Sequence, residues 1–272
     1  MIMKFRDHFY LWRLKLLAKF KRKIIGQRVA ALIVETEQGA FAIKPEDQEV
    51  GRKLLTEGGY DKEVIHKWQS FLSEDDRVLI VGGHIGSLAI PLSNKCRAID
   101  VIEANPFTYK LLTYNKALNA CHNMEIFHCA AAEKKGKLEF YANKVNSGGS
   151  KRKPKHDSYK YNYDNPDLIE VDTVVLDDLL AENKYKLIIM DIEGSEYFAL
   201  QGMQKLLSMT ECLQVEYLTH HLEEVAGVNQ QQFFPLILPH FSKIEVPGRP
   251  ILAISEFDYQ NFDKDCDLVF YK

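Results

Sequence analysis

The segment from Arg77 to Ala89 limits the folds open to this chain more than any other segment does. It begins with an apolar, mostly β-branched run, Val78 to Val81, which leads directly into Gly82, Gly83 and Gly86. An apolar pattern at helical spacing follows. This order predicts a strand buried on both faces of a parallel sheet, then a tight turn, then a helix, as in α/β proteins.

The turn itself indicates a ligand site. Glycine lets the backbone come close to a ligand, and the first N–H groups of the next helix favour a negatively charged group. About 20 residues further on, Ile99 to Glu103 is predicted to be a second strand that ends in a carboxylate, where a ribose hydroxyl pair is held in such folds. We therefore expect an adenosine-type ligand. The spacing differs from the Gly-x-Gly-x-x-Gly pattern of nicotinamide enzymes, but an NAD-dependent oxidoreductase stays open as an alternative.

Length and composition are those of one globular domain with additions. The 272 residues are 46% hydrophobic and 27% charged, which is enough to bury a sizeable core. A formal net charge of −3 gives no general attraction to nucleic acid, and we expect no nucleic-acid partner. The five cysteines are odd in number and lie mostly in apolar contexts, which predicts reduced thiols in a cytoplasmic protein.

Residues 1–72 are predicted to form an attachment that precedes the main sheet. Residues 1–25 mix Lys and Arg with large apolar residues, which predicts a basic amphipathic helix too charged to span a bilayer. This helix packs on its own domain, packs on a second copy in a homo-oligomer, or attaches peripherally to an anionic membrane surface; these alternatives stay open. A hairpin over 29–43 and helices over 46–56 and 61–72, the latter with Asp61 as N-cap, are expected next.

Strand and helix patterns alternate through residues 73–272, as in a parallel sheet of about seven strands with crossover helices. Ligands bind at the carboxyl ends of the strands in such sheets. A polar cluster, Asp191-Ile192-Glu193-Gly194-Ser195-Glu196, stands at one of these ends. Further strands are expected at 124–129, 137–141, 169–175, 185–190, 212–218, 241–246 and 268–271, and helices at 106–120, 177–181, from 196 through 206, and 230–238.

The segment 142–167 interrupts this alternation. It combines Asn146-Ser147-Gly148-Gly149-Ser150 with a basic run, Lys151 to His156, and three tyrosines. A loop this long inside a compact domain is usually a lid, a binding loop or disordered. We expect it to be poorly ordered without ligand and to cover a substrate, and its basic residues favour an acidic or phosphorylated one. A solvated mobile loop is the alternative.

Several motifs, in this order, resemble the FkbM family of methyltransferases. They are Val81-Gly82-Gly83-His84-Ile85-Gly86, Ile102-Glu103-Ala104-Asn105-Pro106, Ala130-Ala131 before Gly136, Leu176-Asp177-Asp178-Leu179 and Asp191-Ile192-Glu193-Gly194-Ser195-Glu196. The resemblance implies the class I methyltransferase fold over 73–272, a Rossmann-like α/β fold whose seven-stranded, mostly parallel sheet has an antiparallel last strand. It also implies S-adenosyl-L-methionine as cofactor and O-methylation of a sugar, glycan or secondary metabolite.

The resemblance and the strand-end positions together assign site residues. The cofactor-binding residues are expected to be Gly82, Gly83, His84, Gly86, Glu103, Ala104, Cys129, Ala130 and Asp191. Asp191 is expected beside the transferred methyl group, with Glu193, His220 or His221 as the base that removes the acceptor's proton. The expected acceptor contacts are Ser147, Lys151, Arg152, Glu196 and Glu216.

Two competing accounts of these residues stay open. A divalent metal on the carboxylates is one, but ligands from other strands cannot be placed, and we predict no metal. Ile80 and Ile189 stand where the family usually has an acidic residue and often has a lysine. They leave open a methyltransferase fold that has lost activity and serves as a binding scaffold.

Overall fold

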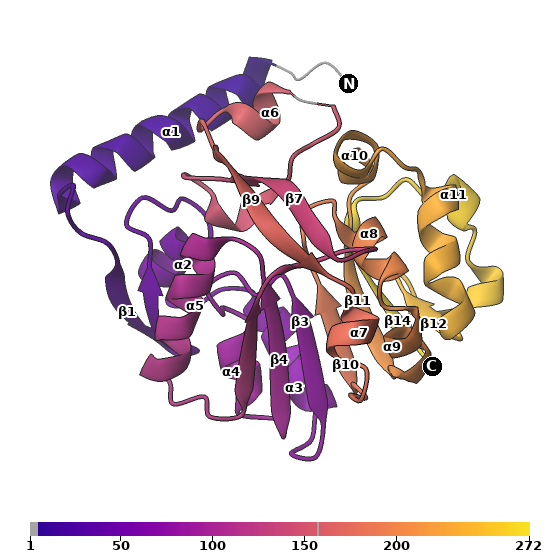
Figure 1. Cartoon of the computed structure of the whole chain (residues 1–272). Helices are drawn as coiled ribbons and strands as arrows, with labels where there is room; N and C mark the ends of the chain where they lie inside the picture. The colour runs from indigo at the N-terminus through magenta and orange to yellow at the C-terminus, as the bar shows by residue number, and fades with distance from the viewer. Residues whose placement is uncertain (1–4, 157) are drawn as a thin grey trace.

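The centre of the molecule is one large sheet. The computed structural model describes residues 5–156 and 158–272, and its eight-stranded sheet has the order β13-β12-β14-β11-β10-β3-β4-β5 (Figure 1). The strands are β3 Arg77–Val81, β4 Ala98–Glu103, β5 Met124–His128, β10 Leu187–Met190, β11 Cys212–Tyr217, β12 Lys243–Glu245, β13 Leu252–Ala253 and β14 Cys266–Tyr271. Strands β11, β10, β3, β4 and β5 are parallel, and β14 runs antiparallel between β11 and β12. The expected mostly parallel sheet with an antiparallel last strand is confirmed, and β13 is an additional edge strand.

Strand β3 lies mid-sheet and is buried on both faces. Leu79 and Val81 belong to one hydrophobic cluster, whereas Val78 and Ile80 belong to a second cluster on the opposite face. The first cluster is covered by α7 Leu176–Leu179, α8 Glu196–Gln201, α9 Gln204–Met209 and α11 Gln230–Phe233. The second is covered by α2 Val50–Glu57, α3 Lys62–Phe71, α4 Ala89–Ser93 and α5 Pro106–Leu118. Because helices cover both faces of the sheet, residues on both sides of β3 are buried. This explains the uninterrupted apolar run in the sequence.

A smaller sheet, β6-β9-β7-β8, lies above the central one in Figure 1. Its strands are β6 Ala130–Ala131, β7 Gly136–Ala142, β8 Lys151–Arg152 and β9 Asp167–Val174. The segment 142–167 is therefore not the loop without secondary structure that the sequence predicts. Strand β8 pairs antiparallel with β7, and the short helices η1 Ser147–Gly149 and α6 Tyr159–Asn162 flank it. The Asp164 carboxylate also accepts hydrogen bonds from the backbone N–H groups of Lys144 and Val145. These bonds link the two ends of the segment.

The N-terminal elements share the core of the central sheet, apart from the first helix. Helix α1 Phe5–Ile25 contacts the molecule through one side only, and β1 Leu32–Thr36 with β2 Gly39–Ile43 forms the expected hairpin. Side-chain oxygens of Asn115 and Asn119 on α5 accept the N–H groups of Ala42 and Ala40, which ties the hairpin down. Among the described residues, no helix combines the length and apolarity that crossing a membrane requires.

Several helices differ from expectation. The helix after the glycine turn, α4, is only five residues long. Asp61 precedes α3 as expected, but its side chain makes no capping hydrogen bond and its φ is 45°. The expected helix over 230–238 is divided into α11 and two 3₁₀ turns, η3 Phe234–Leu236 and η4 Leu238–His240, because each turn contains a proline without an N–H donor. The remaining elements are α10 Thr219–His221, the π-helical η2 Leu222–Ala226, η5 Ile254–Glu256 and η6 Tyr259–Asn261.

Candidate active site

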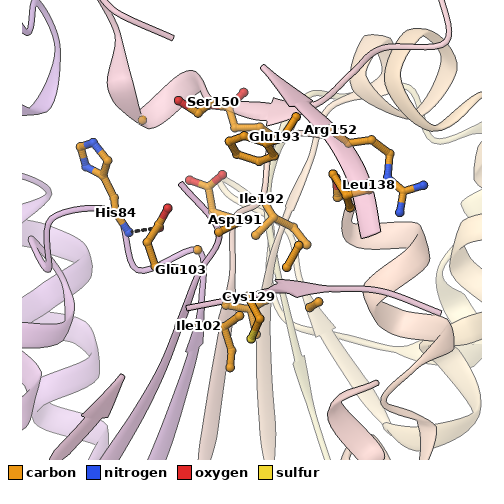
Figure 2. A pocket seen from close by; sticks show the side chains of 18 of the residues that line it. His84, Ile102, Glu103, Cys129, Leu138, Ser150, Arg152, Asp191, Ile192 and Glu193 are labelled. Carbon is orange, nitrogen blue, oxygen red and sulfur yellow. Dashed lines mark hydrogen bonds between the residues drawn. The ribbon is translucent and has the colours of Figure 1, made fainter. Parts of the chain in front are cut away.

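Two adjoining cavities open where β3, β4 and β10 end. The first, here the narrow cavity, has a volume of about 60 Å³ and is shown in Figure 2. The second, the wide cavity, has a volume of about 240 Å³. Both are lined by Val81, Gly82, His84, Gly148, Asp191 and Glu193. Because ligand pockets usually enclose roughly 300–1,000 Å³, the narrow cavity must widen to take a nucleoside.

The glycine turn packs closely against the ends of the neighbouring strands β4 and β10. The N–H groups of Gly82 and Gly83 both donate to the Ile102 carbonyl oxygen on β4, at 3.0 and 2.9 Å. These two N–H groups are therefore engaged within the protein, and the expected helix N–H groups belong to residues further along the turn. Gly82 has a φ of 97°, and a Cβ there would overlap the Asp191 carbonyl oxygen. Gly82 borders both cavities, Gly83 borders the wide one, and Gly86 borders neither of them.

Glu103, the last residue of β4, places its carboxylate on the narrow cavity beside His84 (Figure 2). One oxygen accepts the His84 backbone N–H at 2.6 Å, which holds His84 at a φ of 50°. The other accepts the Asn105 N–H and the Thr108 hydroxyl, both at 2.8 Å. Burial raises the pKa of Glu103 to about 7, and these hydrogen bonds oppose the rise. Three of its four lone-pair sites are then in use, and the remaining one can still accept a ribose hydroxyl.

The wall beyond Glu103 is apolar. It consists of Ile102, Ala104, Cys129, Ala130, Leu138 and Phe140. Burial raises the pKa of the Cys129 thiol to about 11, so this side chain is neutral at pH 7. Three predicted residues, Ala104, Cys129 and Ala130, thus border the same cavity as Glu103. A flat apolar space beside a ribose-binding carboxylate suits an adenine ring.

The segment 142–167 covers the narrow cavity with Ser147, Gly148, Ser150 and Arg152. The Ser147 hydroxyl donates to Asp47 at 2.6 Å and lies 2.8 Å from His84 Nε2. The Arg152 guanidinium lies over the Phe198 ring at 3.8 Å, and its buried Nε has no hydrogen-bond partner among the described residues. Arg152 and Ser147, predicted to contact the acceptor, therefore stand on the side of the cavity that suits the cofactor.

The turn after β10 brings acidic groups to the junction of the cavities. Asp191 is an exposed residue that opens onto both cavities, but many protein atoms lie near its carboxylate and limit its hydration. This desolvation, with the nearby charges of Glu193 and Glu196, raises the pKa of Asp191 well above its ordinary value. Glu196 itself is buried, and its two oxygens accept the backbone N–H groups of Ile192 and Gly194, both at 2.8 Å. Glu196 therefore holds the turn together, and its predicted contact with an acceptor does not fit this geometry.

Four ionisable side chains near Asp191, those of Lys151, Glu193, His221 and Glu216, contact one another in a row. The Lys151 ammonium donates to Glu193 Oε2 at 2.7 Å and lies 3.3 Å from His221 Nε2. On its other side, His221 Nδ1 lies 3.7 Å from Glu216 Oε2. Burial and the Lys151 charge lower the pKa of His221, so its ring is neutral. Burial and the charge of Asp191 raise the pKa of Glu216.

Three predicted residues therefore do not reach the cavities directly. Lys151, His221 and Glu216 line neither cavity. Lys151 and His221 lie beside Glu193, and Glu216 lies on the far side of His221. His220 turns away, with its Nδ1 3.7 Å from Asp265. This removes His220 from the candidates for a base, and leaves Asp191 and Glu193 as the acidic groups in both cavities.

Within residues 5–156 and 158–272, two groups of side chains have the spacing of metal ligands, namely Glu193 with Glu216 and His221, and Asp191 with Glu196 and Glu216. Each group includes a carboxylate that already has close partners. Glu193 accepts a hydrogen bond from Lys151, and Glu196 accepts hydrogen bonds from two backbone N–H groups. We assign no metal to this site.

The wide cavity contains residues that the sequence analysis did not assign to the site. Glu49, Tyr60 and Asp61 border it together with Asn146. Asp47, buried behind it, accepts both the N–H and the hydroxyl of Ser147. The only local signal is the acidic stretch around Asp47 and Glu49, which interrupts the pattern between hairpin and helix. Its nearness to β3 depends on tertiary packing.

One family model and several solved structures are similar to this chain. The sequence profile described as the methyltransferase FkbM domain matches residues 81–246. Among solved structures, the methyltransferase FkbM from Methylobacillus flagellatus KT is 18% identical, with a TM-score of 0.47, over 74% of this chain and 44% of that one. M. jannaschii TYW2 in complex with AdoMet is 16% identical, with a TM-score of 0.41, over 70% and 63%. Trm5b from Pyrococcus abyssi is 13% identical, with a TM-score of 0.45, over 90% and 56%.

The chain spans less than two thirds of the length of each of these three proteins. A search of curated proteins gave no match.

Proposed function

The chain belongs to the FkbM family of S-adenosylmethionine-dependent methyltransferases, and on this premise we propose that it methylates a hydroxyl oxygen of a sugar, glycan or other hydroxylated metabolite. The observation that carries the proposal is the position of Asp191. This carboxylate borders both cavities. Two molecules, one bound in each cavity, would therefore meet beside Asp191. Transfer between two bound molecules requires such a junction.

The lining of the narrow cavity suits the cofactor, although the cavity must widen to admit it. The Glu103 carboxylate suits the ribose, and the apolar wall from Ile102 to Phe140 suits the adenine. Arg152, whose Nε is buried without a partner, offers a donor at the same wall. When bound, the cofactor would supply an electrophilic methyl group on a sulfonium sulfur, with neutral S-adenosylhomocysteine as the leaving group.

The protein's own residues must then orient the acceptor and take its proton. Asp191 suits the second task because its raised pKa brings a carboxylate closer to the basicity that proton abstraction needs at neutral pH. Glu193 is less suited, because its carboxylate already accepts a hydrogen bond of 2.7 Å from the Lys151 ammonium. We therefore place the base at Asp191 and give Glu193 a positioning role.

The wide cavity fits a neutral, hydroxyl-rich acceptor. Its polar lining consists mainly of the acidic groups Glu49, Asp61, Asp191 and Glu193, with the Tyr60 hydroxyl and the Asn146 amide. No Lys or Arg among the described residues borders it. Carboxylates and amides accept hydrogen bonds from sugar hydroxyls but repel phosphate. The lining argues against the acidic or phosphorylated acceptor expected from residues 151–156, and against a nucleic-acid backbone. A small molecule or glycan remains the acceptor we propose.

Calorimetric titration with S-adenosylmethionine, S-adenosylhomocysteine and NAD tests the cofactor assignment. We expect the first two ligands to bind and NAD not to bind. Binding of NAD alone would support an oxidoreductase, and binding of none would support a scaffold. Release of S-adenosylhomocysteine can then be screened over neutral and phosphorylated sugars, where we expect turnover with neutral acceptors.

A further inference from the structure

Helix α1 is attached to the molecule through one face. Leu11, Leu14 and Ala18 pack against Val145 and Tyr163 of the segment 142–167. Further contacts lie at the edges of this face: the Tyr10 hydroxyl donates to Glu49, and Lys15 donates to Asn165. Arg22 also pairs with Glu46, and the His8 ring stacks on Tyr159. The orientation of the helix about its own axis is thereby fixed.

The opposite face carries a stripe of large apolar side chains in water. Phe9, Trp12, Leu16 and Phe20, here called the outer stripe, follow one another at helical spacing and are 55%, 49%, 44% and 61% exposed. At about 100° per residue, they point away from Leu14 and Ala18. The rings of Phe9 and Trp12 contact each other with centroids 5.7 Å apart. Figure 1 shows α1 running along the periphery of the molecule.

The charge around the outer stripe is strongly positive. Helix α1 contains seven Lys or Arg residues and one Asp, a formal charge of +6, whereas the whole chain has −3. Arg6, Arg13, Lys19 and Lys23 are exposed and flank the stripe. Phe, Trp and Leu on the exposed face, edged by Lys and Arg, are the composition of helices that lie in the interface of an anionic bilayer. Each basic side chain near such a surface adds electrostatic attraction.

We propose that α1 binds the surface of an anionic membrane through the outer stripe, lying in the plane of the interface without crossing it. The stripe enters the boundary between headgroups and acyl chains, and the flanking basic residues contact the lipid phosphates. Because Leu11, Leu14 and Ala18 fix α1 to the rest of the molecule, binding turns this side of the protein toward the lipid. The inference does not depend on the reaction proposed for the cavities.

The two tryptophans of the chain give a direct assay. Trp12 belongs to the outer stripe, whereas Trp68 is completely buried in the core. The full chain is mixed with vesicles of phosphatidylcholine containing about one third phosphatidylserine, or with phosphatidylcholine alone. We expect the Trp12 emission to shift to the blue and to be quenched by brominated acyl chains only with the anionic vesicles, and 0.5 M salt should weaken the binding. Trp12→Phe should abolish the shift without abolishing cosedimentation.

Matched variants separate the membrane from other partners. The pair Leu16→Ser with Phe20→Ser should lower vesicle partitioning at least about tenfold, since two large buried apolar groups are lost. Ile33→Ser removes a side chain that is 65% exposed on β1 and should leave partitioning unchanged. Absence of binding to anionic vesicles would overturn the proposal. So would concentration-dependent self-association, seen by sedimentation, that the Leu16/Phe20 variant abolishes, because a second copy would then cover the stripe.

Discussion

Lys151 donates a hydrogen bond of 2.7 Å to Glu193, and this ion pair joins β8 to the turn after β10. The ammonium is almost fully buried, whereas Glu193 keeps some access to the cavities. The segment 142–167 is thus held against the acidic turn by a charge as well as by its strand pairing.

Replacing Lys151 by Met should destabilise the protein by about 1–3 kcal/mol, because Glu193 loses its charged donor while the neighbouring acidic groups remain. Urea denaturation at pH 7 measures the change. Lys137→Met breaks the exposed pair with Glu170, and we expect at most about 0.5 kcal/mol there. Equal effects of the two variants would show that the buried pair has no special weight.

Removing the Glu216 carboxylate should stabilise the protein, whereas Lys151→Met should destabilise it. Its folded-state pKa lies above the ordinary value because of burial and Asp191, so the folded state disfavours the charged carboxylate. The resulting destabilisation is absent at low pH and grows as the pH rises above about 4.5. Glu216→Gln should therefore stabilise the protein by about 0.5–2 kcal/mol at pH 8 and by less at pH 5, in thermal or urea unfolding. Glu211→Gln, in the exposed pair with Lys186, should show no such gain.

Gly82 is required by the carbonyl oxygen of Asp191. Gly82→Ala places a Cβ against this backbone atom and at a φ of 97°, so strands β3 and β10 must separate at their ends. We expect a loss of more than about 2 kcal/mol or failure to fold. At Gly148, a Cβ would meet only ordinary contacts at 3.5 Å or more, and Gly148→Ala should change the unfolding free energy by less than about 1 kcal/mol. A stable Gly82→Ala variant would contradict this packing argument.

The local sequence pattern predicts the position of a site side chain wherever that position follows from the strand that carries it. Glu103 and Asp191 end or follow buried strands, and parallel strands bring their carboxyl ends to one edge. Lys151 illustrates the opposite case. Its basic run suggested an exposed loop, but pairing of β8 with β7 turns the side chain inward to Glu193, and no local pattern encodes this pairing. Similarly, nothing in the glycine turn itself reveals that Ile102 already accepts its N–H groups.

Glu103 should make cofactor affinity depend on pH. Its folded-state pKa of about 7 lies above the ordinary 4.5, so the protonated carboxyl predominates in the free protein at pH 6. A protonated carboxyl accepts ribose hydroxyls poorly, and the dissociation constant for S-adenosylmethionine should rise several-fold between pH 8 and pH 6. The contribution of this group to stability has the opposite sign, falling as the pH rises from about 4.5 through 7. Glu103→Gln should bind about ten- to a hundredfold more weakly at pH 8 and lose the pH dependence in calorimetry.

Asp191 should carry the largest effect on turnover. It follows β10 directly, so the buried strand and the packed Gly82 hold its carboxylate in place at the junction of the two cavities. Asp191→Asn keeps the shape of the side chain but removes the proton acceptor, and we expect methyl transfer at least about a hundredfold slower with S-adenosylmethionine binding retained. The matched Glu193→Gln variant changes a neighbour that Lys151 already neutralises, and we expect a loss of about tenfold or less. Release of S-adenosylhomocysteine with an acceptor from the sugar screen measures both variants. Near-normal turnover in Asp191→Asn, or a greater loss in Glu193→Gln, would move the base from Asp191 to Glu193.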